Sequence, residues 1–287
     1  MCGICGYIKL NDVDQFNQRE LLKMTNTMQH RGPDDIGYHS DKNLFLGMRR
    51  LSIIDTEKGN QPIYSEDKKI VIVMNGELYN YQELKQKLIA KGITFKTNSD
   101  TEVVLKMYEL HGVNCINKLQ GMFAFCIHDS QQNLTWITRD RFGIKPLLYY
   151  CDSDKLIFGS TIDSIIASGK VDKLVDEESL RLYLLISFVP TPKTIYRNIN
   201  KLKPGHQIII KDKSINISQY WCVEDHIDSL ETNDFERHFI NLLNKSVDIH
   251  SLSDVPVGTF LSGGIDSSVI TKLYKSTNKS DFNTFSA

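Results

Sequence analysis

The sequence predicts an α+β protein built in layers, followed by the beginning of an α/β domain. Short apolar runs typical of strands dominate the first 165 residues, and helical stretches do not follow them one for one. The sequence pattern changes after about residue 170, where longer amphipathic and Pro-rich stretches begin. A parallel doubly wound sheet needs regular alternation of strands and helices, so the first part favours the layered α+β class.

Each expected element rests on a local pattern. Helices are expected at 18–30, 81–91 and 99–110, and the last two are followed by Gly92 and Gly112, which permit a left-handed cap. Ser99-x-x-Glu102 has the pattern of a capping box, which places Asp100 in the first helical turn. Apolar runs predict strands at 2–10, 44–47, 70–75, 121–129, 134–140 and 146–150.

The later part of the chain predicts the domain boundaries. A helix at 176–187 and a Pro-rich segment lead to a strand at 206–211, and the polar stretch after it is typical of a hairpin turn or a linker. An amphipathic helix at 234–250 precedes one strand-turn-helix unit, and the chain ends inside an expected further strand. We therefore expect a first domain over 1–210, a linker over 211–232 and the start of a second domain over 233–287.

Composition excludes several classes of function. The 34 basic and 35 acidic residues give a net charge of −1, so the chain lacks the basic excess of a nucleic-acid binder. No apolar run reaches the roughly 20 residues that span a bilayer, and the N-terminus lacks the layout of a signal peptide. We expect a cytoplasmic protein whose six cysteines are reduced thiols, with no membrane or nucleic-acid partner.

Cys2 is the first candidate for chemistry. Removal of the initiator Met would leave a thiol and a free α-amine on one residue, and an amine that titrates near pH 8 is a suitable base for the thiol proton. Position alone favours an ordinary thiol at a chain end. Cys2-x-x-Cys5 also has the spacing of a redox pair or half a zinc site, but no second ligand pair follows. On a strand Cys5 faces away from Cys2, so we interpret Cys5 as a packing residue.

Seven motifs occur in this order along the chain: CGICGYI, HRGPDDIG, RRLSIID, MNGELYNY, NSDTE, LQGMFAFCIHD and RDRFGIKPLLYY. Together they resemble the glutaminase domain of glutamine-hydrolysing asparagine synthetase, a class II glutamine amidotransferase of the N-terminal-nucleophile hydrolase family. The resemblance implies a four-layer αββα sandwich of antiparallel sheets over 1–210, with Cys2 as the nucleophile.

The same resemblance implies the residues that would bind glutamine. The side-chain amide of Asn75 and the backbone N–H of Gly76 would hold the oxyanion formed when the thiol attacks the substrate amide. Arg50 would bind the α-carboxylate and Asp100 the α-ammonium, with Glu77 assisting. No cofactor is implied for this half of the reaction. His30 is not assigned to catalysis, because the nucleophile carries its own amine.

A glycine-rich loop opens the second domain. The segment 253–268, SDVPVGTFLSGGIDSS, resembles the pyrophosphate-binding loop of the same enzymes, and backbone N–H groups at a helix N-terminus suit an anion. The resemblance implies ATP as a substrate of an ATP-pyrophosphatase-like domain, with Asp266 near the accompanying Mg²⁺. The residues that would bind ATP are Leu261, Ser262, Gly263, Gly264, Ile265, Asp266 and Ser267.

The predicted function is therefore that of a glutamine-hydrolysing asparagine synthetase. Its substrates would be L-glutamine, ATP and L-aspartate, and a homodimer is one option for its assembly. The second domain of such enzymes continues well past this loop, so we expect this chain to be truncated in the synthetase half. Two alternatives stay open: a related amidotransferase that amidates another carboxylate, and a non-catalytic remnant that still binds nucleotide or glutamine.

Overall fold

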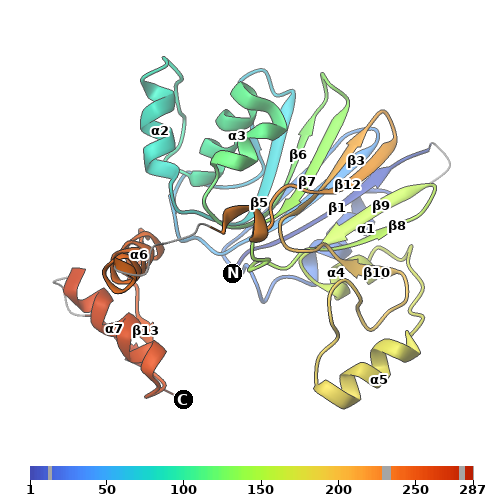
Figure 1. Cartoon of the computed structure of the whole chain (residues 1–287). Helices are drawn as coiled ribbons and strands as arrows, with labels where there is room; N and C mark the ends of the chain where they lie inside the picture. The colour runs from blue at the N-terminus through green and yellow to red at the C-terminus, as the bar shows by residue number, and fades with distance from the viewer. Residues whose placement is uncertain (12–14, 228–233, 278–281, 287) are drawn as a thin grey trace. The chain divides into compact units, whose positions relative to one another are not determined.

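The computed structural model describes residues 1–11, 15–227, 234–277 and 282–286, shown in Figure 1. They form two compact units. The first comprises Met1–Ser52 and Glu57–Cys222, and the second comprises Ile53–Thr56 and the described residues from Val223 onward. Within these ranges, no helix has both the length and the apolar character needed to cross a membrane.

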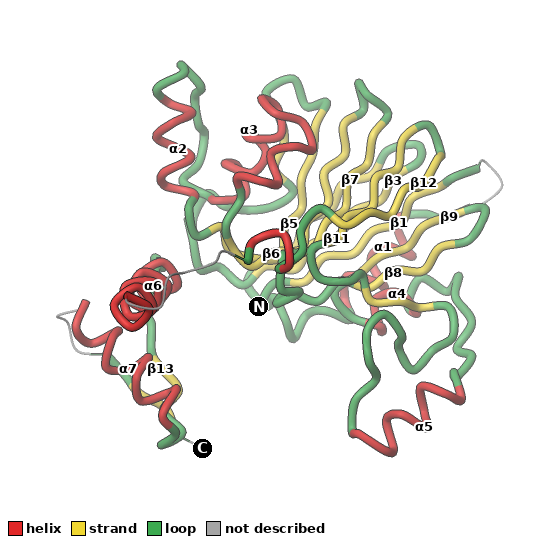
Figure 2. The backbone as a smooth tube through the Cα atoms, in the orientation of Figure 1, coloured by secondary structure: helices red, strands yellow, loops and turns green. Residues whose placement is uncertain are grey.

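The first unit contains, among its described residues, two six-stranded antiparallel sheets. The first sheet has the order β10-β8-β9-β1-β3-β2, with bounds Ile199–Lys201, Leu148–Cys151, Lys155–Gly159, Gly3–Lys9, Leu44–Arg50 and Asp35–Ser40. The second has the order β12-β11-β7-β6-β5-β4, with bounds Ser214–Gln219, His206–Lys211, Leu134–Arg139, Gly121–Asp129, Ile70–Leu78 and Ile63–Tyr64. Figure 2 shows the strands of the two sheets in yellow between the helices.

Helices cover the outer faces of both sheets, which gives the four layers implied by the resemblance. The apolar clusters place α1 (Gln18–Asn26) and α4 (Ile162–Ile166) on the first sheet. They place α2 (Tyr81–Ile89), α3 (Asp100–His111) and the 3-10 helix η1 (Gly112–Lys118) on the second. A further helix, α5, spans Glu177–Ile186. The predicted α+β sandwich of antiparallel sheets is confirmed.

The alternation of side chains along each strand explains the layers. In β1, Ile4 and Ile8 pack in the cluster between the sheets, whereas Cys5 and Tyr7 pack in the cluster beneath α1. Successive side chains on a strand point to opposite faces, so a strand that is apolar on both faces fills two layers at once. Each such buried side chain contributes roughly 1.5–3 kcal/mol relative to an exposed one. The expected packing role of Cys5 follows from this alternation.

Helix α3 begins where the sequence predicts, but its cap differs from the prediction. Ser99 is the N-cap and its side chain accepts from the Thr101 N–H at 3.2 Å, so Asp100 lies in the first turn. The expected second half of the capping box is wrong. The Glu102 carboxylate accepts instead from the backbone N–H groups of Lys96 at 2.9 Å and Thr97 at 2.7 Å. The loop before the helix supplies closer donors, and Glu102 fastens that loop to the helix.

The first unit runs past the boundary at residue 210 that the sequence suggests. Strand β12 pairs with β11 through residues expected in the linker, and the unit ends at Cys222. The turn between the strands contains Asp212 and Lys213 at positive φ, which suits a tight hairpin. Alternating polar residues in SINISQ conceal the strand, because its outer face is exposed at the sheet edge. Of the rest of the expected linker, residues 223–227 belong to the second unit, and 228–232 lie outside the described residues.

The second unit contains a strand-helix-strand arrangement. Strands β13 (Thr259–Phe260) and β14 (Thr284–Phe285) are parallel, and helix α7 (Ile265–Thr277) connects toward β14. Helix α6 (Phe235–His250) precedes them, and a 3-10 turn, η2, spans Glu224–His226. Parallel strands joined through a helix are the basic unit of an α/β domain, which agrees with the predicted start of such a domain.

The side chain of Gln61 fastens the loop before β4 to the second sheet. Its Oε1 accepts from the Met74 N–H at 2.6 Å, and its Nε2 donates to the Met74 carbonyl and the Thr101 hydroxyl, both at 3.2 Å. Gln61→Leu leaves these buried groups unpaired, so we expect the free energy of unfolding to fall by about 2 kcal/mol or more. Urea denaturation measures this. Gln86→Leu, on the exposed face of α2, is the matched control, expected within about 0.5 kcal/mol of wild type; equal stability of both variants would contradict the bracing role.

Candidate active site

Antiparallel pairing of β1 with β3 fixes the position of Cys2. Gly3 lies opposite Arg49, so the residue before β1 lies beside the end of β3. The Cys2 thiol donates to the Leu51 carbonyl at 3.5 Å, and the Leu51 N–H donates to the sulfur at 3.4 Å. Contacts with the backbone of Leu51 therefore hold the side chain of the predicted nucleophile in a defined position beside the end of β3.

Arg31 fixes the backbone of Cys2 from the other side. Its Nε donates to the Cys2 carbonyl at 2.9 Å, and its buried Nη2 atom has no hydrogen-bond partner among the described residues. The next residue, Gly32, lies so close to β3 that a Cβ there would come 2.4 Å from the Arg49 carbonyl oxygen. Sequence reasoning noted the HRGPDDIG motif but missed Arg31, although an Arg-Gly-Pro turn after a helix is a signal for such a close approach.

Arg50 is held in place before any ligand arrives. The side chain is 4 % exposed, and Nη1 donates to the Asn60 Oδ1 at 2.6 Å. Asp34 fixes the end of β3 and the residues directly after it. Its backbone N–H donates to the Arg50 carbonyl at 3.0 Å, and its carboxylate accepts from the Ser52 N–H at 2.8 Å. Of the two adjacent arginines, Arg50 is the buried one and Arg49 is partly exposed.

The second sheet contributes Asn75, Gly76 and Glu77 at the end of β5. Asn75 is 1 % exposed, yet its Nδ2 has no hydrogen-bond partner in the described part of the chain. A buried amide donor without a partner costs stability, which is typical of a group reserved for a ligand. At Gly76 a Cβ would lie 2.2 Å from the Met122 carbonyl oxygen, so only glycine allows β5 to approach β6 this closely. Glu77 is partly exposed.

Asp100 lies at the start of α3 with an exposed fraction of 5 %. Its Oδ2 accepts from the Leu78 N–H at 2.8 Å, which connects it directly to the end of β5. Burial raises the pKa of this carboxyl most, the N–H groups of Leu78 and Thr101 lower it and the charge of Glu77 raises it, which together give a pKa of about 6. Asp100 and Glu77 therefore form an acidic pair, and Asp100 is poised to ionise when a cation approaches.

Burial and nearby positive charges have opposite effects on the pKa of the Cys2 thiol, and the effect of burial is the larger. Burial raises the pKa of the thiol, whereas the Leu51 N–H and the charges of Arg50 and Lys145 lower it. Lys145 is 6 % exposed, and burial lowers its own pKa while the charges of Glu77 and Cys2 raise it. Sequence reasoning missed Lys145, which belongs to the noted motif RDRFGIKPLLYY.

The turn that carries Lys145 is shaped by Asp140. This buried carboxylate accepts from the backbone N–H groups of Phe142 at 3.1 Å, Ile144 at 2.9 Å and Lys145 at 2.9 Å. Three backbone donors on one carboxylate fix the turn, and with it the direction in which the lysine leaves the main chain. In the described chain the α-amine belongs to Met1, and burial lowers the pKa of that amine.

In the second unit, the Gly-rich loop joins β13 to α7. Gly263 has a φ of +82°, and nothing lies within 4 Å of the position of a Cβ there, so the loop backbone is open. The hydroxyls of Ser262 and Ser267 lie 3.1 Å apart at the start of α7. Asp266 and Ser267 border a cavity of about 610 Å³. The Leu261 N–H donates to the Phe285 carbonyl at 2.8 Å, and the side chain of Ile265 is 82 % exposed.

This loop suits an anion and a single accompanying cation. The first-turn N–H groups of α7 have no partner within the helix, and the glycine backbone leaves room for a phosphate. The described residues contain no group of three or more His, Cys, Asp and Glu side chains placed to hold a metal. One carboxylate, Asp266, agrees with Mg²⁺, which commonly keeps one or two protein carboxylates and takes its other ligands from phosphate and water.

A comparison with protein families defines the class. The family described as "Glutamine amidotransferase domain" matches residues 1–221, and the chain therefore belongs to that family. The family described as "Asparagine synthase" matches residues 238–287. The two matches follow the order of the two units and agree with the resemblance seen in the motifs.

Particular relatives narrow this assignment. Asparagine synthetase [glutamine-hydrolyzing] 1 of Bacillus subtilis is 42 % identical, over 96 % of this chain and 44 % of the relative. A putative asparagine synthetase [glutamine-hydrolyzing] 2 of Methanocaldococcus jannaschii is 37 % identical, over all of this chain and 59 % of the relative. The chain thus spans about half the length of the curated relatives it matches. The resemblance to glutamine-hydrolysing asparagine synthetases is confirmed.

Solved structures support the fold. The glutamine phosphoribosylpyrophosphate amidotransferase of B. subtilis, solved with ADP and GMP, matches with a TM-score of 0.57 at 19 % identity, over 99 % of this chain and 65 % of the other. A structure titled as the allosteric regulatory enzyme of purine biosynthesis matches with a TM-score of 0.58 at 18 % identity. At this level of identity the likeness supports the sandwich fold alone.

The placement of Lys145 leads to a test of the site's electrostatics. Lys145→Gln removes a positive charge that favours the Cys2 thiolate, so the pKa of the thiol should rise and its alkylation by iodoacetamide near neutral pH should slow. Alkylation of the N-terminal peptide, followed by mass spectrometry across a pH series, measures that pKa. Lys211→Gln, at the exposed end of β11, is the matched control. An unchanged pKa in Lys145→Gln would show that its charge does not reach the thiol.

Proposed function

We propose that this chain carries the glutamine-dependent half of asparagine synthesis and the beginning of its ATP-dependent half. The first unit hydrolyses L-glutamine to glutamate and ammonia. A complete synthetase domain uses that ammonia, with ATP and L-aspartate, to produce asparagine, AMP and pyrophosphate. The names of the relatives support aspartate as the acceptor over another carboxylate.

The buried, unpaired amide of Asn75 is the observation that carries the proposal. It belongs to a site with a fixed guanidinium at Arg50 and a buried carboxyl at Asp100. Those two groups have the charges required to hold the α-carboxylate and the α-ammonium of glutamine. A structural role alone does not explain an amide donor that is desolvated and unused.

The residues present support a sequence of proton transfers within one residue. After removal of Met1, the amine on Cys2 accepts the thiol proton, and the thiolate sulfur bonds to the side-chain amide carbon of glutamine. The Asn75 Nδ2–H and the Gly76 N–H stabilise the resulting oxyanion. The C–N bond then breaks, the ammonium proton passes to the leaving nitrogen, and ammonia departs from a γ-glutamyl thioester.

Water completes the reaction. The same amine takes a proton from a water molecule as its oxygen attacks the thioester carbon, and the carbon–sulfur bond breaks to release glutamate and the thiol. An α-amine titrates near pH 8 when it is unperturbed, so a fraction of the Cys2 amine is neutral and able to accept a proton near pH 7. The positive charges of Arg50 and Lys145 compensate the thiolate in this poorly hydrated site.

The second unit is proposed to hold the phosphates of ATP. Its loop from Ser262 to Ser267 offers hydroxyls and open backbone at the N-terminus of α7, and Asp266 is the carboxylate placed for Mg²⁺. When bound, Mg²⁺ would neutralise phosphate charge. The cytoplasmic location and the option of a homodimer stay predictions.

Hydrolysis of glutamine by the purified chain tests the proposed half-reaction. We expect release of glutamate by wild type, loss of that release in Cys2→Ala, and a fall of about 10²–10³ in kcat for Asn75→Ala. The unfolding midpoint of Asn75→Ala should change little, because its Nδ2 makes no hydrogen bond in the described chain. Intact mass establishes that Met1 is absent, and Asn216→Ala on the exposed edge strand is the control. Full activity in Cys2→Ala would refute the proposal.

The pKa of Asp100 predicts how glutamine binding depends on pH. With that pKa at about 6 in the free protein, Asp100 is protonated at lower pH and must lose its proton to accept the substrate ammonium. In the inactive Cys2→Ala variant, the Kd for glutamine should therefore rise about tenfold per pH unit below about 6. Glutamine itself does not titrate in this range.

Asp100→Asn in the same Cys2→Ala background supplies the control. The amide oxygen can still accept from the Leu78 N–H, so the fold is retained while the titrating group is gone. Calorimetry should show weaker binding that no longer depends on pH between about 5 and 7. A pH dependence that survives this substitution would assign the titration to another group and contradict the role of Asp100.

A further inference from the structure

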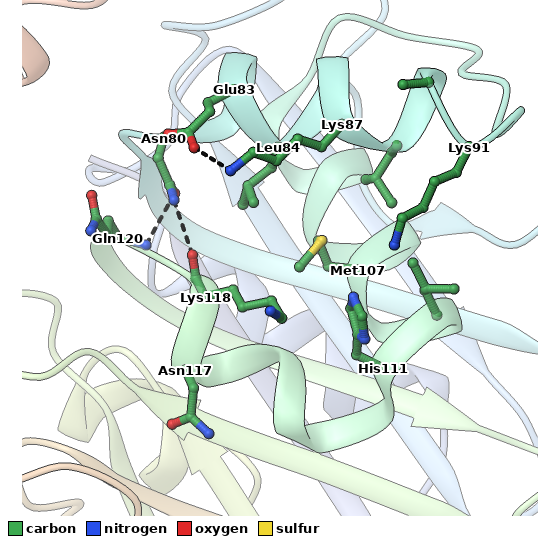
Figure 3. Close-up of a pocket in the computed structure, with 13 residues that line it drawn as sticks. Asn80, Glu83, Leu84, Lys87, Lys91, Met107, His111, Asn117, Lys118 and Gln120 are labelled. Carbon is green, nitrogen blue, oxygen red and sulfur yellow. Dashed lines mark hydrogen bonds and ion pairs between the residues drawn. The ribbon is translucent and has the colours of Figure 1, made fainter.

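A second concave site lies on the helical face of the first unit, with lining residues distinct from those of the proposed glutamine site. Figure 3 shows this pocket, which α2, α3, η1 and the residues next to them enclose. Its volume is about 580 Å³, within the range of pockets that hold small organic molecules. Neither the motifs nor the proposed reaction account for it.

The floor of the pocket is apolar. Leu84 and Leu88 of α2 and Met107 of α3 line it, and each is less than 7 % exposed. Leu110, which is 42 % exposed, extends the apolar surface toward the mouth. An apolar floor of this kind favours a ligand with an apolar body, because water gains little by occupying it.

The rim of the pocket is cationic. Lys87 pairs with Glu83 at 2.5 Å, whereas Lys91 and Lys118 have no carboxylate partner within the described ranges. In Figure 3 the side chains of Lys91, His111 and Lys118 point into the pocket, from the end of α2, the end of α3 and the end of η1. These side chains leave positive charge around the cavity for which the described residues supply no carboxylate partner.

Hydrogen bonds of the Asn80 side chain fix the positions of η1 and the start of α2 relative to each other. The side chain of Asn80 donates to the Lys118 carbonyl at 3.0 Å and accepts from the Gln120 N–H at 3.1 Å, so η1 is fastened to the start of α2. The pKa of His111 is lowered by burial and by the charges of Lys118 and Lys91, in agreement with their proximity in the figure. Repulsion among these groups would be relieved by an anion bound between them.

We propose that this pocket binds a small organic carboxylate with an apolar body, its carboxylate between Lys91 and Lys118 and its body against Leu84, Leu88 and Met107. The charge of the rim excludes a cationic ligand, and the apolar floor distinguishes the ligand from a bare inorganic anion. Helical walls on three sides and the limited volume favour a small molecule over a protein segment. The proposal does not depend on the glutaminase function.

The probe for this site is 3-phenylpropionate, added to the full chain labelled with ¹⁵N. We expect its binding to shift the amide resonances of α2, α3 and η1, with a Kd on the order of 1 mM or tighter. Two partial probes separate the contributions: 3-phenylpropionamide keeps the body without the charge, and acetate keeps the charge without the body. Both should bind at least tenfold more weakly than 3-phenylpropionate.

Substitutions assign the charge to its residues. Lys91→Gln combined with Lys118→Gln should weaken 3-phenylpropionate binding at least tenfold, and each single variant should weaken it less. Lys23→Gln, on the exposed face of α1, removes an equal charge elsewhere and should leave the Kd unchanged. The remaining amide spectrum reports that each variant is folded. Absence of shifts in α2, α3 and η1, equal binding of the amide probe, or unchanged affinity in the double variant would each overturn the proposal.

Discussion

The face-to-face packing of two antiparallel sheets is the constraint on which the candidate active site depends. Cys2 directly precedes β1 and Arg50 ends β3, both strands of the first sheet, whereas Asn75, Gly76 and Glu77 belong to the second. The apolar cluster between the sheets, which contains Ile4 and Met48 from one and Val73 from the other, fixes the distance between these two groups of residues. Packing in that cluster therefore controls how far the proposed nucleophile, Cys2, lies from the proposed oxyanion donors.

Bringing these residues together buries polar groups, which lowers the stability of the folded protein. Asn75 and Arg31 each keep a buried nitrogen atom without a partner in the described residues, and Asp100 is held with a raised pKa. Natural proteins retain such groups where a ligand completes the hydrogen bonding. Arg50 and Lys145 compensate the thiolate, and Leu78 holds the carboxyl of Asp100, so the site is assembled before substrate enters. Preorganisation of this kind is the main physical source of rate enhancement in acyl transfer.

The sequence predicted the layered α+β class and most of the central strands, because those strands are apolar on both faces and have strong signals. It missed β2 and β12, whose residues are more polar, and β9, which follows a turn without glycine or proline. It also missed β4 and β10, which have only two and three residues. The placement of Asp100 was predictable from the cap at Ser99, while the true partners of Glu102 depend on a loop whose path no local pattern specifies. Arg31 and Lys145 were missed because each approaches Cys2 from far along the chain, through Gly32 and Asp140 respectively.

Acylation of Cys2 by glutamine is the step that defines the proposed reaction, and rapid acid quenching during turnover would trap it. The quenched chain is digested, and the N-terminal peptide is analysed by mass spectrometry. The account predicts a peptide that begins at Cys2 and carries one added glutamyl group on sulfur, present during turnover and lost when glutamine is exhausted. Steady release of glutamate with an unmodified N-terminal peptide, or with the glutamyl group on another residue, would contradict it.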